Sequence, residues 1–152
     1  MKTIKYLFLL LTLCLVAVSC EKEPVDNKIE GFWQLDSFTT KADNKNHPCT
    51  RMYYGLAREV AEIATKAYNA NDSALKEEAF VARFSYADNR SKIVLKDFKW
   101  RKTTGDNGKD VDVATLQKYG IHSNPETFTV KIADGKNLVL ESDYAVLTLK
   151  RF

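Results

Sequence analysis

An alternation of apolar and polar residues with a period of two marks the last part of this chain and favours β-strands there. In the stretch "TFTVKIADGKNLVLES" the apolar positions of the outgoing strand share one face: Phe128, Val130 and Ile132. The stretch turns at Asp134-Gly135, a pair typical of hairpins because tight hairpin turns need a positive φ. The return strand places Leu138 and Leu140 on one face, so the pattern predicts a β-hairpin.

A second hairpin is predicted in "FVARFSYADNRSKIVLKDFKW", residues 80–100. Apolar residues alternate along its first strand, and a polar turn follows at residues 87–91. In the returning strand the apolar phase slips near Lys96 and Asp97, after Leu95 and before Phe98. A β-bulge at this point would restore a single apolar face.

The end of the chain, "SDYAVLTLKRF", predicts a last strand with one face made of Ala145, Leu147, Leu149 and Arg151. Before the Asp-Gly hairpin, residues 102–125 are irregular. Within them "TTGDNGKD" indicates an exposed loop, and "DVATLQKYG" indicates a short helical turn that Asp112 caps and Gly120 ends.

Residues 51–78 fit two structures. The apolar positions of this segment have helical spacing: Met52, Leu56, Val60, Ile63 and Ala67. Alternation is clean only over residues 52–56, so periodicity alone predicts a helix from Gly55 to Tyr68. Whether residues 55–70 form helix or strand is open at this point.

The first 19 residues predict a secretion signal, because basic Lys2 and Lys5 precede an apolar run at residues 6–18. That run is shorter than the roughly 20 residues that a membrane-spanning helix needs. "LVAVSC" resembles a bacterial lipobox, in which the cysteine, here Cys20, is acylated and becomes the first residue. An ordinary signal peptide with a chance cysteine is the alternative.

We therefore expect a lipid-anchored protein of the bacterial cell envelope, on the outer membrane, with a flexible tether at residues 20–28 and a domain at residues 29–152. The charged "EKE" after Cys20 resembles surface-export signals of some Gram-negative anaerobes, although a merely solvated linker has the same composition. Without residues 1–19 the chain has 23 − 2 = 21 basic and 20 acidic residues, a net charge of +1. This near-neutral domain lacks the basic stripe of a nucleic-acid-binding protein.

"GFW" places Gly31 two residues before Trp33 at the start of the first predicted strand, and "TLKRF" places Arg151 at the end of the last one. This pairing resembles the calycin and lipocalin superfamily, and in particular small lipocalin-like lipoproteins of Gram-negative anaerobes. The resemblance implies a mainly β fold, an up-and-down antiparallel barrel with one short helical segment, closed by pairing its first and last strands. It favours strand after Gly55, against the helical spacing.

The physical role that we expect for Trp33 is to plug one end of the barrel, with the Arg151 guanidinium on the indole face. Small barrels can also hold a ligand if side chains do not fill them. The leading hypothesis is therefore a binding module for a small apolar or amphipathic ligand, at the end opposite Trp33, lined by inward aromatic residues: Phe84, Tyr86, Phe98 and Trp100. The alternative is that these residues are plain core, and that a filled barrel meets an envelope protein through residues 102–124.

No catalytic or metal site is expected. The domain has two histidines, His47 and His122, and no hydrolase, P-loop or dinucleotide motif. Cys49 lies two residues from His47, but no acid is placed to orient that histidine. With Cys14 removed and Cys20 acylated, Cys49 cannot form an internal disulfide, and it is a reactive thiol, a thiol that pairs between molecules, or a half-buried side chain. Three aspartates in "DNGKDVD" lack the ligand spacing of an EF-hand.

Overall fold

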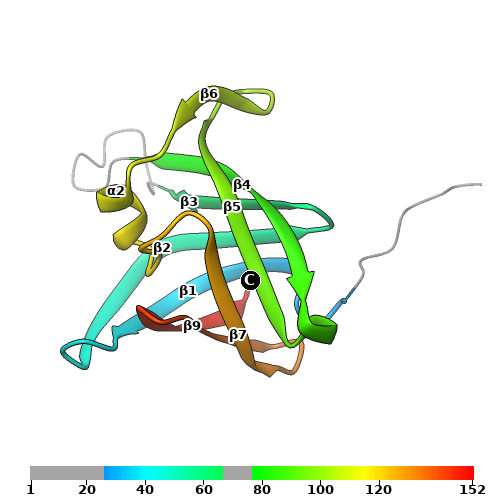
Figure 1. Cartoon of the computed structure of the whole chain (residues 1–152), viewed down its shortest axis with the longest axis vertical. Helices are drawn as coiled ribbons and strands as arrows, with labels where there is room; N and C mark the ends of the chain where they lie inside the picture. Colours follow the sequence, from blue (N-terminus) through cyan, green and yellow to red (C-terminus); the bar gives the residue numbers. More distant parts are fainter. Residues whose placement is uncertain (1–25, 67–76) are drawn as a thin grey trace, which may run out of the picture.

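The alternating segments of the sequence form the strands of a closed antiparallel sheet (Figure 1). The structure is a computed structural model that describes residues 26–66 and 77–152. Its strands are β1 (Gly31–Thr40), β2 (Lys45–Ala57), β3 (Val60–Thr65), β4 (Glu78–Ala87), β5 (Lys92–Arg101), β6 (Asp106–Asp110), β7 (Glu126–Ala133), β8 (Asn137–Glu141) and β9 (Ala145–Arg151). A 3₁₀ turn, η1 (Asp88–Arg90), and a short helix, α2 (Val113–Gln117), complete the described elements.

Two pairings close the barrel: the pairing of β1 with β9 and the pairing of β4 with β5. β1 pairs with both β2 and β9, which confirms the predicted contact between the first and last strands. β4 pairs with β5, and the chain of neighbours β5, β7, β8, β9 then completes the ring. Eight strands form the wall, and β6 is an addition beside the end of β5. Closure pairs most of the strand edges of the wall with a neighbour, which protects an all-β domain against edge-to-edge association.

The β4–β5 hairpin forms as predicted, with the predicted bulge. Lys96 and Lys99, three residues apart on β5, pair with Arg83 and Val81, which are two apart on β4. Asp97 is the extra residue and adopts a positive φ of 57°. The bulge moves Phe98 to the inside, where it is fully buried.

The β7–β8 hairpin also forms, but one part of its predicted pattern is wrong. Val130 pairs with Leu140 while Ile132 pairs with Val139, so β7 has an extra residue between them. This bulge turns Ile132 outward, where 47% of its surface is exposed, instead of onto the face of Phe128. At the turn Gly135 has the positive φ, and the Asp134 carboxylate accepts hydrogen bonds from the backbone amides of Lys136 and Asn137.

The helix predicted from Gly55 to Tyr68 is wrong over the residues that the structure describes. β2 and β3 are a hairpin joined by a turn at residues 58–59, and β1 and β4 flank them. The turn changes the phase of the alternation, so Leu56, Ala61 and Ile63 point inward while Val60 is 52% exposed. This combination of a turn and two short strands imitates helical spacing. Residues 67–70 lie outside the described part of the chain.

One end of the barrel is covered by the segment that follows β6. The predicted loop at residues 103–110 is exposed, but Asp106–Asp110 also pairs with β5 as a short strand. The predicted helical turn is confirmed as α2, with the Asp112 carboxylate accepting a 2.8 Å bond from the Thr115 amide. After α2, Tyr119 is buried, and its carbonyl oxygen accepts the Tyr54 hydroxyl at 2.5 Å. This segment lies across the end that the sequence analysis expected to be open.

At the other end Trp33 and Arg151 face each other across the β1–β9 pairing. The Arg151 guanidinium carbon lies 4.2 Å from the centre of the fully buried indole ring. The same guanidinium donates hydrogen bonds of 2.7–3.0 Å to three carbonyl oxygens: Asn27, Glu30 and Gly135. Gly31 has a φ of 148°, and a Cβ there would lie 1.6 Å from Arg151 Nη1. Glycine is therefore required because the arginine occupies the space of a side chain.

We predict that Trp33→Ala lowers the free energy of unfolding by about 3–5 kcal/mol, because it removes a large buried side chain and leaves a cavity. Urea denaturation followed by far-ultraviolet circular dichroism measures this change. Phe152→Ala is the control, since Phe152 is 71% exposed and its truncation removes only edge contacts with two rings, which should cost about 1 kcal/mol. Equal denaturation midpoints for the two variants would contradict the prediction.

Candidate functional site

The four aromatic residues proposed as ligand contacts do not surround a common hollow. Phe84 and Phe98 are 2% and 0% exposed and belong to the core. Tyr86 is partly buried, and its hydroxyl donates a 3.0 Å bond to Glu30 Oε1 near the Trp33 end. Burial raises the pKa of Tyr86, and the Glu30 carboxylate raises it further. Trp100 is also partly buried and meets the edge of Phe80, nearer the α2 end.

Side chains fill the barrel interior along the described strands. Its largest fully buried members come from six strands and from the segment after α2: Trp33, Leu35, Tyr54, Leu56, Ile63, Phe80, Phe84, Ile93, Leu95, Phe98, Tyr119 and Phe128. Several hollows lined by described residues lie on the outside of the wall. The core interpretation of the inward aromatics therefore fits the geometry better than a pocket inside the described barrel.

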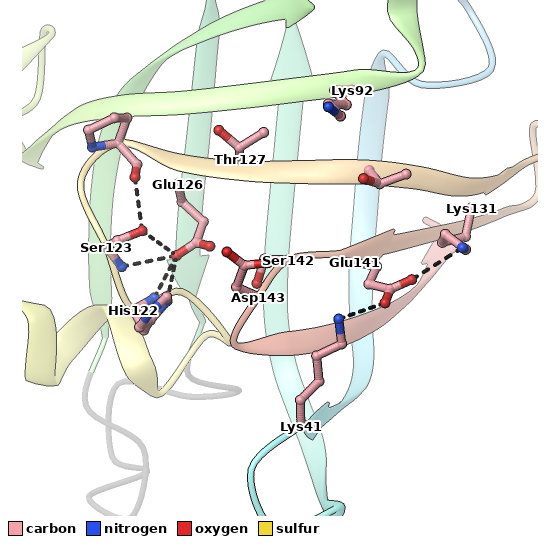
Figure 2. A pocket seen from close by; sticks show the side chains of 12 residues that line it. Lys41, Lys92, His122, Ser123, Glu126, Thr127, Lys131, Glu141, Ser142 and Asp143 are labelled. Carbon is pink, nitrogen blue, oxygen red and sulfur yellow. Dashed lines mark hydrogen bonds and ion pairs between the residues drawn. The ribbon is translucent and has the colours of Figure 1, made fainter. Parts of the chain in front are cut away.

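A polar groove opens where two neighbouring strands separate (Figure 2). β7 pairs with β5 from Glu126 onward, but it pairs with β8 only from Thr129. β8 ends at Glu141, and the chain turns at residues 142–144 into β9. The start of β7 therefore has no strand on its other side, and a hollow of about 580 Å³ lies there.

A buried carboxylate lies at the inner end of this groove. The Glu126 side chain is 3% exposed, and its Oε2 atom accepts hydrogen bonds from the backbone amides of His122 and Ser123 at 2.8 and 2.9 Å. The same oxygen lies 3.0 Å from Ser123 Oγ and 3.2 Å from His122 Nδ1. Among the described residues no hydrogen bond reaches the other oxygen, Oε1. In Figure 2 the carboxyl group points across the gap toward Ser142 and Asp143.

The lysines of the groove are already paired with carboxylates. Lys41 and Lys131 lie 2.7 and 3.3 Å from the two oxygens of Glu141, and they lower the pKa of that carboxyl group. Lys92 pairs with Asp88 at 2.6 Å, and the hydrogen bond raises the pKa of the lysine. The negative charge at the Glu126 end is therefore not matched by a lysine at hydrogen-bonding distance among the described residues.

The other polar side chains of the groove fix the conformation of the turns around it. The Ser142 hydroxyl oxygen accepts hydrogen bonds from the amides of Tyr144 and Ala145, each at 3.2 Å. The His122 ring stacks on Tyr144 with centroids 4.9 Å apart. The Ser123 hydroxyl donates to the Pro125 carbonyl oxygen at 2.8 Å and lies 3.0 Å from Glu126 Oε2.

Sequence reasoning missed Glu126, although the sequence contains a signal for it. Glu126 lies two residues before the buried Phe128 and is therefore in phase with the inward face of β7. A carboxylate on an inward face is costly unless it is hydrogen-bonded or paired. A charged residue in phase with an apolar face therefore indicates that hydrogen-bond partners surround it inside the fold.

The remaining sequence candidates have structural roles. Cys49 Sγ donates to the His47 carbonyl oxygen at 3.4 Å, and burial raises the pKa of the thiol to about 11. The His47 ring stacks on Phe38 instead of activating Cys49. The three aspartates of the calcium-like loop have separate partners: Asp106 a backbone amide, Asp110 a lysine and Asp112 the start of α2. No group of metal ligands is found in the part of the chain that the structure describes.

Cys20 and the rest of residues 1–25 lie outside the described residues, so the lipidation site stays a prediction. In the described ranges, no helix has both the length and the apolar character required to cross a bilayer.

Comparison with known proteins agrees with the described fold. A family model for a lipocalin-like domain matches residues 12–152. A lipocalin-like protein from Bacteroides uniformis is similar in structure, with a TM-score of 0.60 and 15% sequence identity over 82% of this chain and 99% of that one. An uncharacterized protein from Bacteroides eggerthii has a TM-score of 0.54 and 15% identity over 81% of this chain and 98% of that one. No curated protein matches. These findings confirm the resemblance predicted from the sequence.

We predict that Glu126→Gln lowers the free energy of unfolding by about 1–3 kcal/mol, because a neutral amide replaces a buried carboxylate that accepts charge-assisted bonds. Urea denaturation measures the loss. Glu141→Gln is the matched control, since Glu141 is solvent-accessible and should have a smaller effect. A Glu126→Gln protein as stable as the parent would show that the carboxylate does not hold the His122–Ser123 turn.

Proposed function

This chain belongs to the family of lipocalin-like domains, and we propose that it is a lipid-anchored protein of the bacterial cell envelope that binds a small, ammonium-bearing molecule in the groove of Figure 2. The proposed role is non-catalytic. The anchor is the acylated Cys20, on the outer membrane. The tether is shorter than the predicted residues 20–28, because Asp26 and Asn27 are hydrogen-bonded to the Trp33 end of the barrel, so residues 20–25 link the domain to the anchor. Support for the anchor comes from the basic start, the apolar run and the lipobox-like "LVAVSC".

The observation that carries the binding proposal is the Glu126 carboxylate. It is nearly completely buried, its Oε2 atom has several donors, and its Oε1 atom has none among the described residues. No buried side-chain oxygen of the described residues lacks a hydrogen-bond partner, so Oε1 reaches the solvent of the groove, where a ligand that donates to it would replace water. Charge-assisted N–H donors make the strongest such bonds.

The charges around the groove favour the same ligand class. Two lysines share Glu141, and the third has Asp88, so a ligand anion must compete with existing pairs. At the other end Glu126 and Asp143 line the hollow, and an ammonium group there meets negative charge without displacing a cation.

The apolar or amphipathic ligand expected from the sequence would need space inside the barrel. The inward side chains Phe84 and Phe98 are packed in the core, and the segment around Tyr119 covers the end opposite Trp33. The same filled interior favours a second candidate function: a structural lipoprotein whose outer face meets an envelope protein.

Titration of ¹⁵N-labelled domain with butylamine tests ligand binding, with butyrate as a probe of equal chain length and opposite charge. We expect butylamine to shift the amide signals of His122, Ser123 and Ser142 with a roughly millimolar Kd, which is the scale for so small a ligand. Glu126→Gln should weaken binding about tenfold, equivalent to about 1.4 kcal/mol.

Glu62→Gln is the matched control, since Glu62 pairs with Arg101 away from the groove, and its Kd should stay close to that of the parent domain. Equal affinities for butylamine and butyrate would contradict an acidic site. Decanoate shifting the signals of inward residues such as Phe84, with no effect of butylamine, would favour an apolar ligand inside the barrel. No shift with any probe would favour the second candidate.

The anchor has its own prediction. Cys20→Ser should move the protein from the membrane fraction to the soluble fraction of its host, because the acyl chains that hold it are lost. Fractionation followed by immunoblotting measures the distribution, and Cys49→Ser is the matched control that keeps the anchor. Membrane retention of the Cys20→Ser protein would contradict lipidation at Cys20.

A further inference from the structure

Most of the exposed large apolar side chains gather at one end of the barrel. Among the described residues there are four: Val60, Val113, Ile132 and Phe152, with exposed fractions of 52%, 44%, 47% and 71%. Val60 follows the β2–β3 turn, Ile132 precedes the β7–β8 turn, and Phe152 follows Arg151. Ile132 and Phe152 lie at the Trp33 end, since Arg151 pairs with Trp33 and its backbone amide donates to the Lys136 carbonyl oxygen in the β7–β8 turn. Val60 lies there too, because it pairs with Ala57, next to the pairing of Leu56 with Gly31. Val113, on α2, is at the other end.

Phe152 is part of an ordered aromatic cluster on the outer wall. Phe32 and Tyr53 stack with ring centroids 5.4 Å apart, and Phe152 meets them edge-on at 5.6 and 5.1 Å. The Phe152 amide also donates a 3.0 Å bond to the Phe32 carbonyl oxygen. Beside the cluster lies a mainly apolar hollow lined by Gly31, Phe32, Gly55 and Leu56 among others. Tyr53 is the amphipathic ring of this cluster, and tyrosine is enriched at membrane interfaces.

The chain enters the barrel at the same end. The described part begins at Asp26, and the Ile29 carbonyl oxygen accepts the Trp33 indole N–H at 2.8 Å. Figure 1 shows this start of the chain on the side opposite α2. Six residues, Cys20 to Val25, precede Asp26, and even a fully extended chain of that length spans at most about 20 Å. An acylated Cys20 would therefore keep the Trp33 end close to the bilayer.

We propose that the Trp33 end of the barrel docks on the lipid bilayer through an apolar rim made of Val60, Ile132 and Phe152. This inference rests on the lipid anchor of the proposed function. The rim side chains enter the headgroup region, to the depth of about 5–10 Å that interfacial apolar faces reach. Glu126 lies at the start of β7 and Ile132 near its end. The docked orientation therefore turns the Glu126 end of the groove away from the membrane.

Lipid-quenching of site-specific dyes tests this orientation with the acylated full-length chain in phosphatidylethanolamine–phosphatidylglycerol vesicles. In a Cys49→Ser background, single variants Val60→Cys, Ile132→Cys, Phe152→Cys and Val113→Cys carry an environment-sensitive dye. Lipids brominated near the headgroup should quench the three rim positions at least about threefold more than position 113, because this quenching acts within a few ångströms of the interface. Equal quenching at all four positions, or stronger quenching at position 113, would overturn the docking.

In a second quenching measurement the dye is attached outside the rim, so that the rim side chains themselves can be changed. With the dye on Lys136→Cys, in the β7–β8 turn, the triple change Val60→Ser, Ile132→Ser and Phe152→Ser should reduce quenching to the level of position 113. Val113→Ser, which removes the remaining exposed apolar side chain, should leave it unchanged. All these positions are exposed, so the fold should tolerate the changes. Unchanged quenching in the triple variant would show that the rim does not hold the domain.

Vesicle flotation measures membrane attachment through the lipid anchor, independently of whether the rim contacts the bilayer. If the acylated protein floats with vesicles and its rim is not quenched, the anchor stands and the docking is wrong. If the protein does not float, the anchor is wrong and the docking inference falls with it.

Discussion

The contact between Trp33 and Arg151 is the interaction on which the architecture depends. It joins the first strand to the last, so it forms only when the barrel is closed. The guanidinium lies on the indole face and uses its N–H groups on carbonyl oxygens from two separate parts of the chain. Gly31 is part of the same unit, because a side chain there would occupy the position of the guanidinium.

Closing both ends has a consequence for function. Trp33 fills one end, and the segment around Tyr119 covers the other, so the described interior is a core. Binding then depends on the outside of the wall, where strands separate. The gap beside the start of β7 is such a place, and the Glu126 carboxylate gives it a specific chemical character. Ile132 of the apolar rim lies near the end of β7, and Glu126 of the groove lies at its start. In the proposed orientation the rim therefore contacts the membrane while the Glu126 end of the groove stays open to a ligand.

The sequence predicted the local features well and the longer-range ones unevenly. The Asp97 bulge and the Asp112 cap follow from patterns within a few residues, and both are confirmed. The helix at residues 55–68 is wrong over its described part because a turn between two short strands imitates helical spacing. Ile132 points outward because an extra residue in β7 shifts its register against β8. Glu126 was missed, although its phase with Phe128 was visible.

What the sequence determined by itself is the mainly β class, the two hairpins and the expectation that the chain ends meet, since alternation and the Gly31, Trp33 and Arg151 signature are readable residue by residue. Only the tertiary structure decided which inward aromatics are core, and that the segment after α2 covers the second end. It also decided that a gap beside β7 exposes one oxygen of Glu126. These features depend on how distant strands pack and where their pairing stops, and no local pattern contains that information.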